Sequence, residues 1–152
     1  AGGASIGPAA DGRIKPDLCF FYDDTYTTYS TSGGYGEFGG TSGATPSICG
    51  HFGLFFQMWN DGVFGNFPNP AGDIFTNRAH AATAKAMMIN TASRYGNINR
   101  IAQGWGRINV QSAYERGDEM LVVDEDVILA EFETAQFART LTPADDAGDV
   151  TR

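Results

Sequence analysis

The sequence predicts an α/β domain built around one long buried helix that begins at Ser42, followed by a shorter β-rich segment. Three observations lead to this prediction. A nearly continuous apolar run at residues 48–59 directly follows a stretch rich in Gly, Ser and Tyr. A second apolar run, at residues 18–22, follows Pro16-Asp17 and indicates a buried strand. Beyond about residue 115, both the charge balance and the residue pattern change.

The helix expected from Ser42 to about Asn60 has apolar side chains around most of its circumference. A helix that is apolar on all sides is a buried helix, so this one should lie at the centre of the domain. Pro46 fits its first turn, where the backbone needs no N–H donor. Its apolar residues are Ile48, Phe52, Leu54, Phe55, Phe56, Met58 and Trp59.

Further elements are expected along the first 114 residues. Residues 15–22 predict a buried strand, and residues 25–31, where Thr, Tyr and Ser alternate, predict a short exposed strand. Residues 61–78 contain Gly, Asn and Pro throughout and predict a surface loop. Residues 80–93, rich in Ala and Met, predict a helix. Residues 104–106 predict a turn, and residues 108–114 are strand-like and then helical.

The whole net charge of −8 lies in the last quarter of the chain. Residues 1–114 carry seven acidic and seven basic side chains, whereas residues 115–152 carry eleven acidic and three basic ones. Short apolar runs at residues 121–123, 127–129 and 132–141 predict strands. We therefore expect one domain at residues 1–116 and the start of a β-rich accessory domain or tail at residues 117–152. Since the chain has no basic patch and no long apolar span, neither nucleic acid nor a membrane is an expected partner.

Ser42 stands where the Gly-rich stretch meets the helix, a position that suits a nucleophile. The N–H groups of a first helical turn lack intrahelical partners. Together with the helix dipole, they can stabilise a developing oxyanion. Considered alone, Ser42 fits an ordinary N-cap role better, because that role is common for serine. Thr41 either contributes beside the oxyanion or is a turn residue.

The stretch Gly40-Thr41-Ser42-Gly43-Ala44-Thr45-Pro46 resembles the Gly-Thr-Ser-x-Ala-x-Pro nucleophile motif of the subtilisin-like serine proteases, the subtilases. Three more segments resemble subtilase segments in the family's order. They are a Lys-Pro-Asp strand at residues 12–18, a helix ending in Thr-Ala at residues 85–92, and a Gly-x-Gly-x-Ile/Val-Asn turn at residues 103–110. Gly39-Gly40 is also similar to the start of the related sedolisin motif, but the Lys-Pro-Asp and Gly-Trp-Gly segments favour subtilases.

The resemblance implies a serine endopeptidase that cleaves proteins or peptides, and a fold built on a parallel sheet. Ser42 would be the nucleophile and its backbone N–H an oxyanion donor, with Gly40 and Thr41 in the substrate and oxyanion neighbourhood. The family places its catalytic Asp, His and oxyanion Asn well upstream of the serine. Only 41 residues precede Ser42, and none of them is histidine.

We therefore expect the chain to be the C-terminal half of a subtilase catalytic domain, cut before Ala1 and inactive alone. Its partner would be the N-terminal half of the same domain, and the family implies a secreted or extracytoplasmic protein. The sequence departs from the family pattern at residues 19–22, which replace x-Ala-Pro-Gly. It departs again at Ser47, where the family often has histidine.

Two other functions stay open. The protein could be a non-catalytic binding or scaffolding module of subtilase fold whose triad is incomplete. Alternatively, Gly40-x-Ser42-x-Ala44 is loosely similar to the Gly-x-Ser-x-Gly elbow of a different acyl-transfer fold. His51 does not supply a base, because nine residues of helix place it about 13.5 Å along the axis from Ser42. His80 should cap or precede its helix, and Asp17 belongs, by the resemblance, to a structural strand.

No cofactor and no dedicated metal site is expected. Calcium is the alternative for the oxygen-rich loop, since calcium binds such side chains, although they are also ordinary turn residues. The loop residues are Asn60, Asp61, Gly62, Asn66, Asn69 and Asp73. Cys19 and Cys49 are expected either as buried free thiols or as a disulfide.

Overall fold

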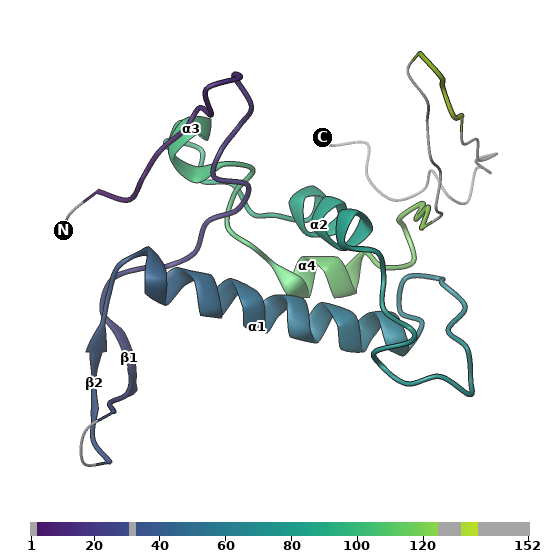
Figure 1. Ribbon diagram of the computed structural model, residues 1–152, viewed down its shortest axis with the longest axis horizontal. Helices are drawn as coiled ribbons and strands as arrows, with labels where there is room; N and C mark the ends of the chain where they lie inside the picture. Colours follow the sequence, from purple (N-terminus) through teal and green to yellow (C-terminus); the bar gives the residue numbers. More distant parts are fainter. Residues whose placement is uncertain (1–2, 31–32, 125–131, 137–152) are drawn as a thin grey trace.

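A single long helix organises the molecule (Figure 1), a computed structural model that describes residues 3–30, 33–124 and 132–136. This helix, α1, spans Thr41–Asn60. Helices α2, Ala81–Asn90, and α4, Val110–Glu115, lie along one side of it, and α3, Arg100–Gln103, lies further away. A two-stranded antiparallel hairpin projects beyond the start of α1.

Helix α1 begins and ends where the sequence dictates. Gly40 precedes it with φ of 85°, a conformation that favours glycine, and Pro46 lies within the first turns. At the other end, Gly62 N donates to Trp59 O and Val63 N donates to Met58 O. With Gly62 at φ of 73°, these bonds form a Schellman motif that stops the helix. The predicted bounds of this helix are confirmed.

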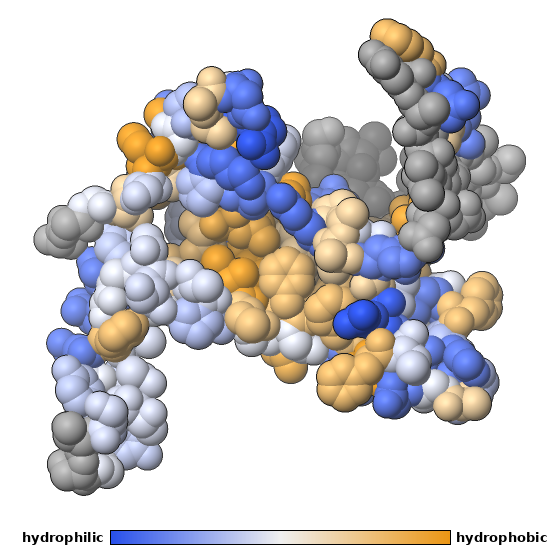
Figure 2. Space-filling model, viewed as in Figure 1, coloured by the Kyte–Doolittle hydropathy of each residue, from blue (hydrophilic) through white to orange (hydrophobic). Residues whose placement is uncertain are grey.

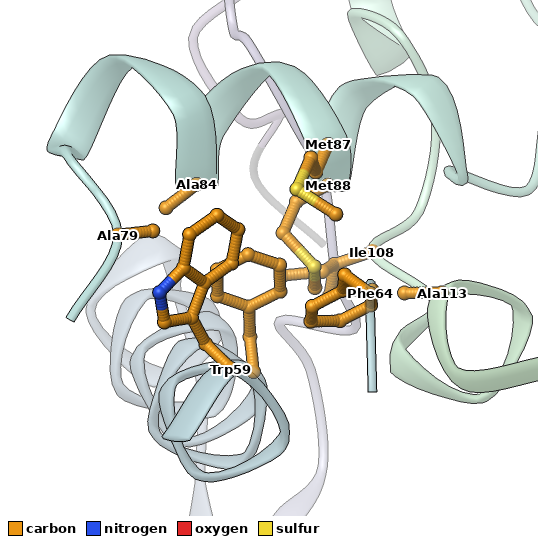
Figure 3. Packing of buried hydrophobic residues seen from close by; sticks show 9 residues of the cluster. Trp59, Phe64, Ala79, Ala84, Met87, Met88, Ile108 and Ala113 are labelled. Carbon is orange, nitrogen blue, oxygen red and sulfur yellow. The ribbon is translucent and has the colours of Figure 1, made fainter. Parts of the chain in front are cut away.

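The hydrophobic core lies between the second half of α1, helix α2 and helix α4 (Figure 3). Phe55 and Met88 are fully buried, and Ile108 is almost so. The Phe55 and Phe64 rings stack with centroids 5.1 Å apart. Burying each large apolar side chain of this kind stabilises the fold by about 1.5–3 kcal/mol. The core therefore holds the C-terminal half of α1 in place.

The expectation that α1 is buried on all sides is wrong for this structure. Only Gly43, Phe55 and Trp59 are buried in it, while Leu54 is 57% exposed. The described helices pack on one side of α1 only, so the opposite side stays open. Figure 2 shows apolar side chains gathered over the middle of the molecule, along α1.

The hairpin consists of β1, Thr25–Thr28, and β2, Tyr35–Phe38. Its register pairs Thr25 with Phe38 and Thr28 with Tyr35. The predicted exposed strand at residues 25–31 is thus confirmed in its first half. Strand β2 lies in a stretch whose glycines predicted coil. Tertiary pairing with β1 gives these residues a β conformation that their own composition does not favour.

The predicted buried strand at residues 15–22 is reduced to a single bridge. Cys19 pairs in parallel with Arg107, and Arg107 pairs antiparallel with Ser93. A strand needs neighbours on which to form a ladder, and within the described residues this segment has only the 105–108 segment beside it. The secondary structure described is therefore helices with one small antiparallel sheet, and a parallel sheet is not among it.

Two more predictions concern the later elements. The helix predicted at residues 80–93 is confirmed as α2, with His80 at its N-cap position. Of residues 108–114, the helical part is confirmed as α4. Its N-cap Asn109 accepts a hydrogen bond from Ser112 N, which explains why the helix begins there. The loop predicted at residues 61–78 is confirmed.

The segment after α4 packs on the core. Met120 and Val122 lie against the core cluster, and Asp124 Oδ1 accepts a hydrogen bond from His80 N at 3.1 Å. The strand predicted at residues 121–123 is wrong, because these residues are irregular. Apolar contact with the core fixes them without a partner strand. The strand predicted at residues 127–129, and that at 132–141 apart from residues 132–136, lie outside the described residues. Residues 132–136 are not a strand either.

None of the helices in the described part of the chain is both long and apolar enough to cross a membrane.

Candidate active site

Ser42 is the second residue of α1 and is exposed at its N-terminal end. Within the described residues its hydroxyl has no hydrogen-bond partner. The next two hydroxyls of the helix differ. Thr45 Oγ1 donates to Thr41 O at 2.9 Å, and Ser47 Oγ donates to Gly43 O at 3.1 Å. Within the described residues, the hydroxyls of Thr41 and Ser42 are therefore exposed and unbonded at this helix end, whereas those of Thr45 and Ser47 are bonded to the helix backbone.

The backbone around Ser42 leaves N–H groups available. Gly43 N donates to Gly40 O at 2.8 Å, which closes the first turn of the chain entering α1. The N–H of Ser42 comes before the first intrahelical bond, so it needs an acceptor from outside the helix. The first turn carries no acidic side chain, and the positive end of the helix dipole is not offset there. An oxyanion beside Ser42 would meet both features.

The two histidines of the chain lie away from Ser42. His51 Nδ1 is 2.8 Å from Ser47 O, and its ring packs against Phe20 with centroids 4.9 Å apart. His80 lies at the start of α2, with Nδ1 3.1 Å from Asp124 Oδ1. Both rings have structural neighbours, and neither is brought to the Ser42 hydroxyl.

Asp17 is held by two lysines. Its carboxylate pairs with Lys85 Nζ at 3.1 Å and with Lys15 Nζ at 2.5 Å. Burial raises the pKa of Asp17, but the hydrogen bonds from Lys15 and Lys85 outweigh it, and the pKa lies below its ordinary value. A carboxylate held in this way ties its own segment to helix α2 through Lys85, which fits the structural role predicted for it.

Three of the segments that resemble subtilases meet at one place, which we call the motif junction: residues 16–19, 91–93 and 104–107. Trp105 N donates to Asp17 O, Cys19 N to Gly106 O, and Arg107 N to Ser93 O. Gly104 has φ of 66°, and a Cβ on it would clash with Pro16 O. The Gly-Trp-Gly sequence is therefore required by close backbone approach.

A cavity of about 280 Å³ connects the motif junction with the start of α1. The helix contributes residues 41, 44, 45 and 48 to its wall, and the junction contributes residues 16, 18 and 19. Most of the lining is apolar. All four resembling segments thus stand in one structural unit, since the helix that follows Ser42 packs on the Lys-Pro-Asp segment, and that segment packs on the Gly-Trp-Gly turn.

Two side chains near the junction received no role from the sequence. Gln103 is 4% exposed. Its Oε1 accepts a hydrogen bond from Tyr95 N, and its Nε2 donates one to Tyr95 O, both at 2.9 Å. Asn109 Nδ2 donates to Ser93 Oγ at 2.7 Å while its oxygen caps α4. Two signals pointed to Asn109: it is the Asn of the Gly-x-Gly-x-Ile/Val-Asn segment, and it stands before a helical pattern, where Asn is favoured. Gln103 had none.

Both cysteines are free thiols. Cys19 is half-buried, and burial raises its pKa, which Arg107 partly offsets. Cys49 lies on the open side of α1 and is exposed. The expectation of free thiols is confirmed, whereas burial of Cys49 is wrong because no described element covers that side of the helix.

The oxygen-rich loop is held together by its own hydrogen bonds. The Asp73 carboxylate accepts from Phe75 N and from Thr76 N, and Asn77 Nδ2 donates to Asn60 Oδ1. No group of three or more His, Cys, Asp or Glu side chains that could hold a metal occurs in the described ranges. The calcium alternative stays a prediction, and the turn role explains these bonds.

Comparison with known families gives one match. The model of the Peptidase_S8 family, described as the subtilase family, matches residues 1–106. This range contains the motif with Ser42 and most of the motif junction. No curated protein gives a significant match to the chain.

Proposed function

This chain belongs to the subtilase family, and on that premise we propose that it carries the nucleophile, Ser42, of a serine endopeptidase. Membership of the family implies serine peptidase chemistry. The observation that favours Ser42 is its position, since it is an exposed, unbonded hydroxyl at the start of a long helix. Protein or peptide chains are the proposed substrates.

In the proposed reaction, Ser42 Oγ attacks the carbonyl carbon of the scissile bond. A histidine removes the hydroxyl proton and later delivers it to the leaving amine, while an aspartate orients that histidine. The backbone N–H of Ser42 supplies one hydrogen bond to the oxyanion, and an asparagine side chain supplies a second. Thr41 and Gly40 shape the backbone that presents this N–H.

The base must come from outside these 152 residues. The chain has two histidines. His51 is bonded to Ser47 O two turns or more beyond Ser42, and His80 stands at the start of α2 beside Asp124. We propose that the N-terminal half of the same domain provides the histidine, the aspartate and the asparagine.

The same proposal accounts for the single parallel bridge. Cys19 and Arg107 pair as parallel strands do, and in the described part of the chain the apolar segment around Cys19 has a bridge partner on one side only. We propose that strands from the N-terminal half pair with this segment and complete a parallel sheet. Those strands would also cover the open side of α1, where Leu54 is exposed.

The test is covalent labelling of the intact protein with a fluorophosphonate probe. Serine is a weak nucleophile until a base activates it, so we expect the label on Ser42 and on no other serine. Ser42→Ala should abolish labelling. Ser47→Ala is the matched control, because it removes a hydroxyl from the same helix that is already bonded to Gly43 O, and it should keep the label.

Peptide mapping reads out the result. A label at any serine other than Ser42 would contradict the assignment. Absence of label from a folded intact protein would favour the non-catalytic alternative, a subtilase-fold binding or scaffolding module.

A further inference from the structure

The β1–β2 hairpin has one packed face and one open face. On the packed face, Thr25 and Thr27 are half-buried, the Tyr29 ring lies over Gly36, and Phe38 touches the position of Gly43 in α1. On the open face, the exposed residues Tyr26 and Thr28 alternate with them. Since Phe38 approaches Gly43, the base of the hairpin lies beside the start of the helix that carries Ser42.

The open face presents two aromatic rings and a carboxylate. Tyr26 and Tyr35 are 72% and 65% exposed, and their rings stack with centroids 5.9 Å apart and planes 16° apart. The strand register places Glu37 directly opposite Tyr26. Directly paired residues have Cβ atoms about 4.5–5.5 Å apart. The Glu37 carboxylate therefore lies within reach of a group bound on the Tyr26 ring.

The stretch of sequence that contains the hairpin carries charged side chains of one sign. From residue 16 to residue 77 the chain has no lysine or arginine, and Asp23, Asp24 and Glu37 lie in and beside the hairpin. Within the described residues, none of these three carboxylates forms an ion pair. A stacked pair of exposed tyrosines next to unpaired carboxylates is suited to a cation, because an aromatic face attracts a cation and a carboxylate pairs with it.

We propose that the open face of the hairpin, formed by Tyr26, Thr28, Tyr35 and Glu37, binds a lysine or arginine side chain of the polypeptide substrate. The proposal rests on the proposed function, since it assigns a substrate feature to a surface beside Ser42. The cation lies on the tyrosine pair, and its N–H groups point to the Glu37 carboxylate.

Chain geometry limits where the basic residue can be. Glu37 precedes Ser42 by five residues, and five residues of chain span at most about 18 Å. A substrate bound in an extended conformation covers the same distance with five to six residues. The preferred basic residue therefore lies within about six residues of the scissile bond.

The test measures binding by the intact protein carrying Ser42→Ala, so that no result depends on catalysis. The probe is a fluorescein-labelled dodecapeptide of Gly, Ser and Ala that contains two adjacent arginines. Its twin contains citrulline in place of arginine, which keeps the shape and removes the charge. We expect the arginine peptide to bind about tenfold more tightly by fluorescence anisotropy, and this difference to shrink in 0.5 M salt.

Variants locate the binding face. Tyr26→Ala and Glu37→Gln should each weaken binding of the arginine peptide about two- to fivefold, without affecting the citrulline peptide. Glu37→Gln removes the charge but keeps the size of the side chain. It therefore tests the binding face even if Tyr26→Ala unfolds the small hairpin. Tyr114→Ala removes an aromatic side chain of similar exposure (60%) from α4 and should change nothing.

Equal affinity for the two peptides, absence of binding, or an unchanged affinity in Glu37→Gln would each overturn the proposal. None of these results bears on Ser42, whose labelling is measured separately in the protein with its native serine. The two proposals can therefore fail independently.

Discussion

The two halves of α1 differ in burial: the C-terminal half packs in the core, and the N-terminal half is exposed at Ser42. Residues 51–60, the core end, carry Phe55 and Trp59, which are buried against α2 and α4. Residues 41–50, the site end, are rich in hydroxyl-bearing and small residues, and Ser42 stands exposed there. One helix thus anchors itself at one end and displays a nucleophile candidate at the other. Substitutions in residues 51–60 should therefore change the stability of the fold, and substitutions in residues 41–50 should change the chemistry of the candidate site.

The site end receives its support from elsewhere in the chain. The site end and the motif junction line the same cavity. The hairpin approaches the site end where Phe38 lies beside Gly43. The core end is held by apolar burial, whereas the motif junction is held by backbone hydrogen bonds and glycine contacts. Changes at the two ends should therefore have different consequences.

The largest expected effect concerns the chemistry of the site end. The purified 152-residue chain should hydrolyse no peptide and take no fluorophosphonate label, because in the proposed function the base that activates Ser42 lies outside this chain. Loss of the histidine of a serine protease triad lowers kcat by about 10⁶. A fluorogenic peptide assay measures the rate. Turnover that disappears on Ser42→Ala would show that a base lies within the chain, and His51 and His80 would need to be considered again.

The next effect concerns the core end. Phe55→Ala should lower the free energy of unfolding by about 3–5 kcal/mol, since it leaves a cavity in a fully packed core. Leu54→Ala, on the adjacent but exposed position, is the matched control and should cost less than about 1 kcal/mol. Urea unfolding followed by tryptophan fluorescence measures both.

Similar costs for the two variants would mean that the exposed side of α1 is covered in the folded protein. That result would support the proposal that the N-terminal half of the domain covers the side of α1 that is exposed in this structure.

The sequence predicted those parts that depend on local signals. Helix α1, its junction with the Gly-rich stretch, the loop after it and helix α2 follow from the apolar pattern, from Pro46 and from the Gly, Asn and Pro residues of the loop. The N-cap at Asn109 is local and was missed although Asn is favoured before a helix. The hydrogen bonds of Gln103 to Tyr95 were missed, because a polar side chain that bonds backbone outside its own turn leaves no periodic signal. Strand β2 was missed for a similar reason, since only its pairing with β1 makes residues 35–38 extended.

The wrong predictions share one physical cause. The buried strand at residues 15–22 and the all-round burial of α1 both require neighbours that the described residues do not provide. An apolar run shows that a segment can be buried but not what covers it. For the candidate site, the residues of the nucleophile motif were predicted. The assembly of the motif junction, where backbone atoms of Pro16 and Gly104 approach each other, was not.

A smaller effect is expected at the motif junction. Gly104→Ala should destabilise the protein by at least about 2 kcal/mol, because the glycine has positive φ and a Cβ would meet Pro16 O. Gly12→Ala is the control, since Gly12 also has positive φ, at 82°, but open space around it. It should cost about 1–2 kcal/mol from the backbone alone. Urea midpoints compare them, and equal costs would show that the junction is not tightly packed.

The smallest effect is electrostatic and depends on pH. The pKa of Asp17 is lowered in the folded protein: burial raises it, and the hydrogen bonds from Lys15 and Lys85 more than offset that. A carboxyl group with a lowered folded pKa stabilises the protein above its unfolded pKa, and this contribution is lost as the pH falls through the folded value. Because these side chains are partly exposed to solvent, we expect only about 0.5–1 kcal/mol.

Asp17→Asn should therefore be less stable than the native sequence at pH 7 by about that amount. The difference should shrink as the pH falls below the ordinary value of 3.8 and vanish below the folded pKa. Urea titrations between pH 2 and 7 measure it, and Asp11→Asn gives the comparison with a carboxylate that is paired with Arg13 but more exposed. A difference that stays constant down to pH 2 would mean that Asp17 acts through its shape and hydrogen bonds rather than its charge. The motif junction would then be held by the same kind of packing as the core end of α1.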